Sequence, residues 1–391
     1  MPHSDKERLN RSNIRTAAYG VLLLALGVGI SRFLYTPMLP KMLEEKIFTF
    51  PQLAWLASAN YGGYLVGSLL FSWSGFHRPR SQNMVFIFSV LSVVLLFAMA
   101  GVDRVNIALV VRFLAGLASA ALMIFGSVTV LHHTNNHWVT ASLFSGVGVG
   151  ILLGNEYVNF VIALQLHAAS LWLGAGVIGL ILLVLLVLLV ILSPTAIAFT
   201  PESQQRPRRK SSVVGWWQLA IVYGLAGFGY IIVATFLPLI SHQLANSVIS
   251  QHLWSLVGLA IIPGCFFWLL MEHRFGITLS LIFNLILQAI CVLLSLNGHS
   301  PLLLILCCLG FGFTFMGTTA LVMPLAKKLP VPAGINLMAL VTFTYGIGQV
   351  CGPLMTGLLQ GQGDPLKISI IAGAGALFIA ALFCLKRSTA I

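Results

Sequence analysis

The chain has 391 residues, of which 58% are hydrophobic and only 8% are charged. Because a soluble globular domain carries about 25% charged residues, this composition excludes a soluble protein and predicts one embedded in a membrane. The formal net charge of +12 does not indicate nucleic-acid binding, since the basic residues stand between apolar segments, where they mark membrane topology.

Apolar runs follow one another along the whole chain, and a membrane-spanning helix needs about 20 such residues. We predict twelve spans, at residues 17–40, 52–73, 83–101, 106–131, 139–164, 168–192, 215–240, 252–271, 276–296, 301–325, 333–359 and 367–385. The first span is too long for a signal peptide and has no small-residue cleavage site, so we expect it to remain as a helix. The predicted fold class is all-α integral membrane.

Lysine and arginine are distributed unevenly between the two sides of these spans. With a cytoplasmic N-terminus, the inner segments hold fifteen of them and the outer loops hold four: Lys41, Lys46, Arg104 and Lys367. Cytoplasmic loops carry an excess of Lys and Arg. We therefore expect both termini in the cytoplasm of a bacterium, with the chain in its inner membrane.

A polar segment at residues 193–214 divides the chain into an N-terminal half, 1–192, and a C-terminal half, 215–391. At an offset near 200 residues, GVGVG at 146–150 faces GIGQV at 346–350, and GAG at 174–176 faces GAG at 373–375. Matches in one register predict an internal repeat. Because each half has six spans, we expect two parallel six-helix pseudo-repeats joined by a cytoplasmic linker, with a cavity between them.

Several motifs resemble one transporter family. VVRFLAGLASA at 110–120 places Gly116 four residues after Arg112, and GIGQVCGPLMTG at 346–357 is a glycine and proline motif. Together with RFLYTPMLP at 32–40 and WLASANYGGYLVGS at 55–68, they resemble the YbfB/YjiJ branch of the major facilitator superfamily. The resemblance implies the major facilitator fold, with spans one, four, seven and ten lining the cavity.

Three formal charges remain inside the predicted spans: Arg32, Arg112 and Glu156. Each costs about 2.5 to 3.5 kcal/mol at the centre of a membrane helix, so each needs a partner, water or a function. In one interpretation, Arg112 and Glu156 form a structural ion pair while Arg32 bonds backbone carbonyls. In the other, at least one guanidinium binds the carboxylate or phosphate of a solute.

The candidate site combines these charges with polar residues of the helices expected to line the cavity. The predicted substrate-binding residues are Arg32, Tyr35, Asn60, Tyr64, Arg112, Tyr230, Tyr345 and Gln349, and Glu156 is the predicted proton-coupling residue. No phosphate-binding GxxxxGK[ST] sequence occurs, so direct ATP coupling is not expected. His132, His133 and His137 lie on a short polar loop without a cysteine or carboxylate, and we expect neither a metal nor a cofactor.

We therefore expect a secondary transporter that moves a small organic, anionic solute by alternating access, coupled to protons. It would be embedded in the lipid bilayer, function as a monomer and bind no nucleic acid. One alternative is a multidrug/proton antiporter, which the glycine motif at 346–357 favours, although two buried arginines suit lipophilic cations poorly. A transport-inactive membrane sensor or assembly partner is a second alternative. An enzyme is not expected, because the spans hold a single carboxylate and no catalytic cluster.

Overall fold

The computed structural model describes residues 3–71, 81–133, 136–192, 214–241, 244, 247–332, 336–359 and 364–385. Every regular element in these ranges is a helix: α1 (His3–Leu24), η1 (Ala25–Ile30), α2 (Tyr35–Glu44), α3 (Phe50–Leu70), α4 (Ser81–Ala100), α5 (Val105–His133), α6 (His137–Ala163), α7 (Ala168–Leu192), α9 (Trp216–Ser241), α10 (Ser247–Phe275), α11 (Ile277–Leu294), α12 (Pro301–Lys328), α13 (Leu337–Leu358) and α14 (Pro365–Leu385). The predicted linker falls almost wholly outside the described residues.

Eleven segments of the described chain are long and apolar enough to cross a membrane. They begin and end within a few residues of the predicted spans, apart from the first, which runs over Arg11–Glu44. The predicted span at 52–73 corresponds to α3, which is not among the eleven. Asn60 and several tyrosines and glycines lower its hydropathy, and α3 packs mainly against α5 and α13.

Local sequence signals set where several helices begin. Thr49 caps α3 in a capping box, in which its backbone N–H donates to Gln52 Oε1 at 2.9 Å. Asn136 caps α6 by accepting from Trp138 N–H at 2.9 Å, and Ser300 precedes Pro301 at the start of α12. Such caps satisfy backbone donors that have no partner within the helix.

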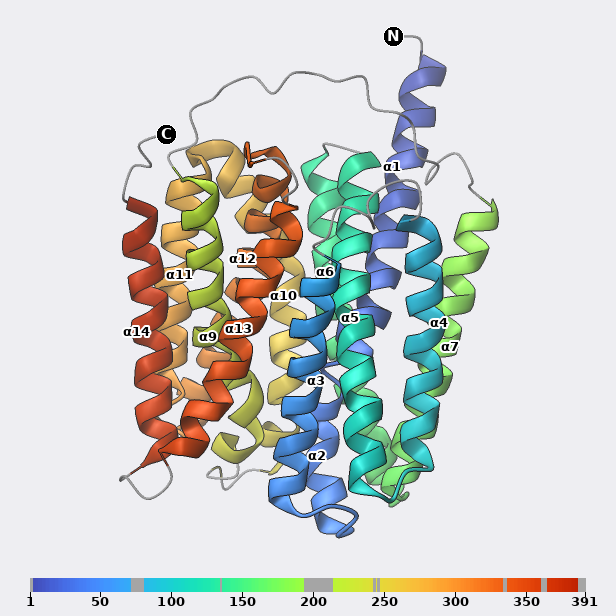
Figure 1. Ribbon diagram of the computed structural model, residues 1–391, viewed down its shortest axis with the longest axis vertical. Coiled ribbons are helices and arrows are strands. Elements are labelled where there is room, and N and C mark those ends of the chain that lie inside the picture. The colour runs from blue at the N-terminus through green and yellow to red at the C-terminus, as the bar shows by residue number, and fades with distance from the viewer. Residues whose placement is uncertain are drawn as a thin grey trace.

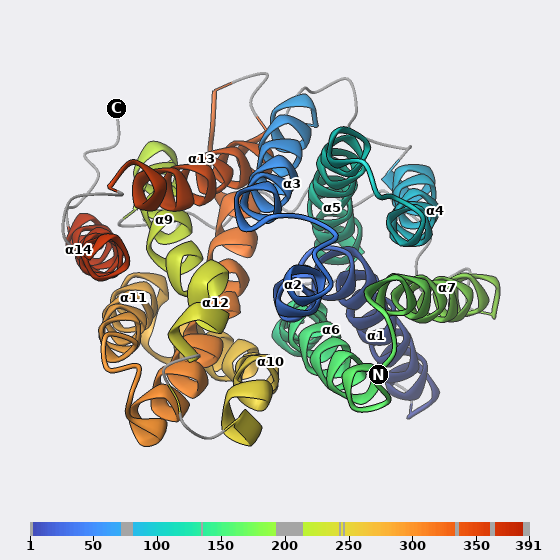
Figure 2. The same cartoon turned by 90° about the horizontal axis from the view of Figure 1, so that it is seen from below.

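The helices form two groups placed side by side (Figures 1 and 2). One group contains the helices from α1 to α7 and the other those from α9 to α14. Contacts between the groups run mainly along α6 against α10 and α3 against α13. The helix α1 begins and α14 ends at the same end of the bundle, which we call the terminal face, and the opposite end is the far face (Figure 1).

The first span is not one regular helix. Its middle is the π-helix η1, and residues 31–34 form a turn before α2 begins. Ser31 closes the π segment, since its N–H and its hydroxyl both donate to Leu26 O, at 3.0 and 2.8 Å. Pro37 and Pro40 follow and lack the N–H groups that would continue a regular hydrogen-bond ladder. Segments of this kind are frequent at functional sites, and this one carries Arg32.

Candidate functional site

Arg32 lies at the junction of the two helix groups and is 4% exposed. Its Nη2 donates to Oε1 of Gln349, on α13, at 2.6 Å. Its guanidinium carbon lies 4.1 Å from the ring centroid of Tyr64 and 5.4 Å from that of Tyr61, both on α3. Because aromatic faces attract a cation, the two tyrosine rings and the glutamine amide stabilise the charge of Arg32. Its Nε has no partner in the described part of the chain.

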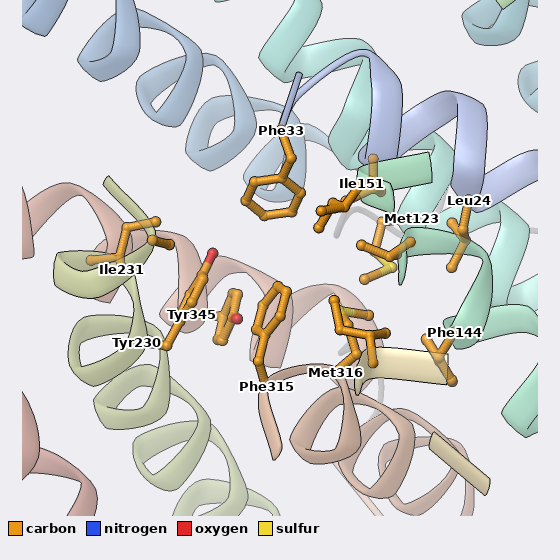
Figure 3. Close-up of a cluster of buried hydrophobic side chains, with 14 of the residues drawn as sticks. Leu24, Phe33, Met123, Phe144, Ile151, Tyr230, Ile231, Phe315, Met316 and Tyr345 are labelled. Atoms are coloured by element: carbon orange, nitrogen blue, oxygen red, sulfur yellow. The ribbon is translucent and has the colours of Figure 1, made fainter. Parts of the chain in front are cut away.

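Gln349 connects Arg32 to a column of aromatic rings in the second helix group. Its Nε2 donates to the hydroxyl of Tyr230, on α9. The ring of Tyr230 stacks on Tyr345 and on Phe315, with centroid distances of 5.3 and 4.7 Å. Figure 3 shows these rings beside one another, with Phe33 approaching from the first helix group. Offset aromatic stacking of this kind contributes about 0.5 to 1.5 kcal/mol per pair.

Arg112, on α5, is 2% exposed, and the hydrogen bond and ring contacts that its side chain makes among the described residues are with the first helix group. Its Nη1 lies 3.5 Å from Ser31 O, a long hydrogen bond, and its guanidinium carbon lies 4.4 Å from the Tyr35 ring centroid and 6.0 Å from that of Trp172. Asn60 Nδ2 donates to the Arg112 carbonyl at 3.0 Å, which joins α3 to α5. Like Arg32, Arg112 has an Nε without a partner among the described residues.

Glu156 lies apart from both arginines. Its Oε1 is 2.8 Å from Nδ1 of His252 and accepts the hydroxyl of Ser255, both on α10. The interpretation in which Glu156 pairs with Arg112 is therefore wrong for this structure, because the rotation of α6 turns the carboxylate toward α10. The expected bonding to backbone carbonyls describes Arg112 rather than Arg32.

Among the described residues, no carboxylate neutralises the two arginine charges. In the described part of the chain, no carboxylate forms an ion pair with Arg32 or Arg112. A third donor near the junction, Nε1 of Trp254, is buried and has no hydrogen-bond partner among the described residues, and its ring lies 6.1 Å from Phe33. A buried donor without an acceptor costs about 1 to 3 kcal/mol, and more when it is charged. These donors form a buried, positively charged centre.

Contacts between the two groups lie on both sides of the centre. At the terminal face, Lys327 of α12 donates to Leu131 O of α5. Toward the far face, the Tyr61 hydroxyl lies 3.1 Å from Oγ1 of Thr235. Both arginines are buried between these contacts.

The structure brings together most of the residues predicted from sequence. Arg32, Tyr64, Tyr230, Tyr345 and Gln349 form one cluster, and Arg112, Tyr35 and Asn60 form a second beside it. Residues that sequence reasoning missed are Phe33, Tyr61, Trp172, His252, Ser255 and Phe315. Helical spacing could have identified Tyr61, because it lies three residues before Tyr64 and therefore on the same face of α3. His252 and Ser255 show the same spacing on α10.

The comparisons with known proteins agree with this description. A family model described as an uncharacterised MFS-type transporter YbfB, where MFS denotes the major facilitator superfamily, matches residues 24–385. No curated protein matches the chain.

Proposed function

Since the chain belongs to this family of MFS-type transporters, we propose that it is a secondary active transporter that moves a small organic anion across the membrane by alternating access. The observation that carries the proposal is the buried centre with two guanidinium groups and no paired carboxylate among the described residues. An arginine fork binds carboxylate or phosphate oxygens in a bidentate manner. An anionic solute would neutralise these charges, whereas a lipophilic cation would be repelled.

Alternating access requires two bodies that move against each other, and we propose two six-helix pseudo-repeats for these bodies, with α3 as the twelfth span. Glycine contacts in both groups support this. Gly146, on α6, packs against the backbone of Val21 on α1, and Gly348, on α13, packs against the backbone of Gly224 on α9. The proposed repeat would relate the first of these helix pairs to the second.

The proposed orientation places the terminal face in the cytoplasm of a bacterial inner membrane. Arg11 and Arg15 lie within α1, which begins at the terminal face, and Arg274, Lys327 and Lys328 lie at helix ends of that face. Lys41, Lys46, Arg104 and Lys367 lie at or near helix ends of the far face. An excess of basic residues on one side favours the cytoplasm for that side.

Coupling to protons is part of the proposal. Glu156 is 43% exposed at the junction of α6 and α10 and is paired with His252. A carboxylate and an imidazole in this position can exchange protons with water. We propose a monomer as the functional unit, because the two clusters and this pair are built within one chain.

Reconstituted vesicles with an imposed pH gradient test this function. We expect uptake or efflux of at least one radiolabelled solute from a panel of small carboxylates and organic phosphates, and none of lipophilic cations. Arg104→Gln, which changes an exposed arginine on a turn, is the matched control for Arg32→Gln. Transport of cations alone, or anion transport that is unaltered in both Arg32→Gln and Arg112→Gln, would contradict the proposal.

A further inference from the structure

The antiparallel helices α6 and α10 are joined at both ends by a histidine and a glutamate. Toward the far face, His252 Nδ1 lies 2.8 Å from Glu156 Oε1. At the terminal face, His137 Nδ1 lies 3.5 Å from Glu272 Oε2. The two pairs are reciprocal, because α6 supplies the glutamate of the first pair and the histidine of the second.

The two pairs are far enough apart to meet different solutions. His137 and Glu156 are 19 residues apart on one helix, which at about 1.5 Å per residue is about 28 Å, close to the thickness of a bilayer core. The side chains of His252 and His137 are 46% and 44% exposed, whereas the arginines are almost fully buried. The two histidines thus lie near opposite ends of the helix pair.

The surroundings of the far pair are polar and uncharged. Ser255 donates to Glu156, and Asn155 Nδ2 donates to Ser255 Oγ at 2.7 Å and to Gln251 O at 2.8 Å. Asn159 Nδ2 lies 3.5 Å from His252 Nδ1. In the described part of the chain, no further charged or titratable group is recorded against this pair from α6, α10 or their neighbours.

The terminal pair has additional basic neighbours. The ring of His273 lies 5.6 Å from that of His137, and the charge of Lys328, at the end of α12, also acts on His137. Between the two pairs, Gly148 and Gly258 let the α6 and α10 backbones pack directly together. Opening either face would have to separate the pair at that face.

We propose that these two pairs are proton-binding gates, each of which responds to the pH on its own side of the membrane. A neutral histidine whose Nδ1–H donates to the glutamate takes up a proton from water on Nε2. This converts a hydrogen bond into an ion pair, which is stronger, so the proton holds that face closed. Release of the proton to a more alkaline solution weakens the pair and favours opening. The proposal rests on the alternating access proposed above.

The pH range follows from the two groups. Free histidine in water titrates near about pH 6.5, and the experiment has to span this range. Acidification from about pH 8 to about pH 6 should therefore favour closure. With an acidic exterior and an alkaline cytoplasm, the far face would be held closed while the terminal face is released.

Spin-label distances in the full-length chain, measured in lipid nanodiscs without any solute, test this proposal. Labels on the exposed residues Asp103 and Asn297 report on the far face, and labels on Leu192 and Arg274 report on the terminal face. Cys351, which is exposed, is first replaced by Ser. For the unsubstituted pairs we expect both distances to shorten between about pH 8 and about pH 6, the range in which histidine gains its charge.

Each gate should be separable by substitution. We expect Glu156→Gln to raise the ratio of open to closed far-face populations at about pH 6 by about two- to fivefold, as for loss of a half-exposed ion pair. The terminal-face distance should keep its pH response. Glu272→Gln should instead open the terminal face at about pH 6 and leave the pH response of the far-face distance intact. The double variant Glu156→His with His252→Glu, which exchanges the two partners, should restore the far-face response. His299→Gln, at an exposed turn, should change neither.

A far-face pH response that survives in Glu156→Gln and His252→Gln, or that is lost in Glu272→Gln, would overturn the proposal. Failure of the gates and failure of the proposed function are distinguishable, because the spin labels report on the conformation of the protein and not on transport. Anion transport with no pH response of the distances would refute the gates only. A normal pH response without any anion transport would refute the proposed function only.

Discussion

The two buried arginines differ in what their contacts connect. Arg32 is bonded to Gln349 and so joins the two helix groups, whereas Arg112 contacts Ser31, Tyr35 and Trp172 within one group. If the groups move against each other, the Arg32 contact has to break and the Arg112 contacts can persist. Arg32 is therefore the arginine whose environment depends on the state of the molecule, and Arg112 is a fixed source of positive potential.

The largest expected effect comes from Arg32→Gln. It removes the planar guanidinium group and its charge. We expect anion uptake to fall at least about tenfold, which corresponds to the free energy of one hydrogen bond to a charged group. Thermal stability should change little, since a buried charge is removed together with its desolvation cost. Arg32→Lys should transport less than the unsubstituted chain, because a point charge cannot replace the fork.

Uptake by Arg32→Gln equal to that of the unsubstituted chain would remove Arg32 from the solute site. It would leave Arg112 as the sole candidate for anion binding among the predicted residues, and the comparison between the two arginines would lose its functional meaning.

A second substitution, Gln349→Glu, gives Arg32 the carboxylate that it lacks. The pair would lock the two helix groups together and neutralise one charge of the centre. We expect anion uptake to fall about tenfold, because the hydrogen bond would then join two charged groups, the guanidinium of Arg32 and the new carboxylate. Uptake assays with Gln349→Asn as the uncharged control measure this, and undiminished uptake by Gln349→Glu would show that this contact does not have to break.

A third prediction concerns the packing that fixes Arg112. A Cβ on Gly116, one turn after Arg112, would overlap the carbonyl oxygen of Asn60, so α3 and α5 would have to separate. We expect Gly116→Ala to destabilise the chain by about 1 to 3 kcal/mol, as overpacking does. Gly62→Ala is the matched control, because a Cβ at Gly62 meets no atom within 4 Å. Equal thermal stability of the two variants would contradict the close packing.

The smallest expected effect is that of Tyr35→Phe. The Tyr35 hydroxyl donates to Leu53 O at 2.7 Å, and its loss should cost about 0.5 to 1.5 kcal/mol of stability. The ring over Arg112 is kept, so anion uptake should be unchanged. A fall in uptake with unaltered thermal stability would instead assign the hydroxyl to the solute site.

Much of the fold could be predicted because hydropathy is a local property. A run of about 20 apolar residues determines a span without reference to the rest of the chain, which is why the spans at 105–131 and 168–192 nearly coincide with prediction. The irregular first span was less predictable. Its glycines and prolines permit a π segment, but the packing of Gly29 against Gly150 on α6 selects it.

The sequence by itself determined that the chain crosses the membrane, that it resembles one transporter family, and that Arg32, Arg112 and Glu156 are its unusual intramembrane charges. Only the tertiary structure decided their partners. Glu156 and His252 are separated by 96 residues, and their contact depends on how α6 and α10 are rotated about their own axes. A span of apolar residues leaves that rotation open, because lipid makes no distinction between one apolar face and another, and only the packing of neighbouring helices fixes it.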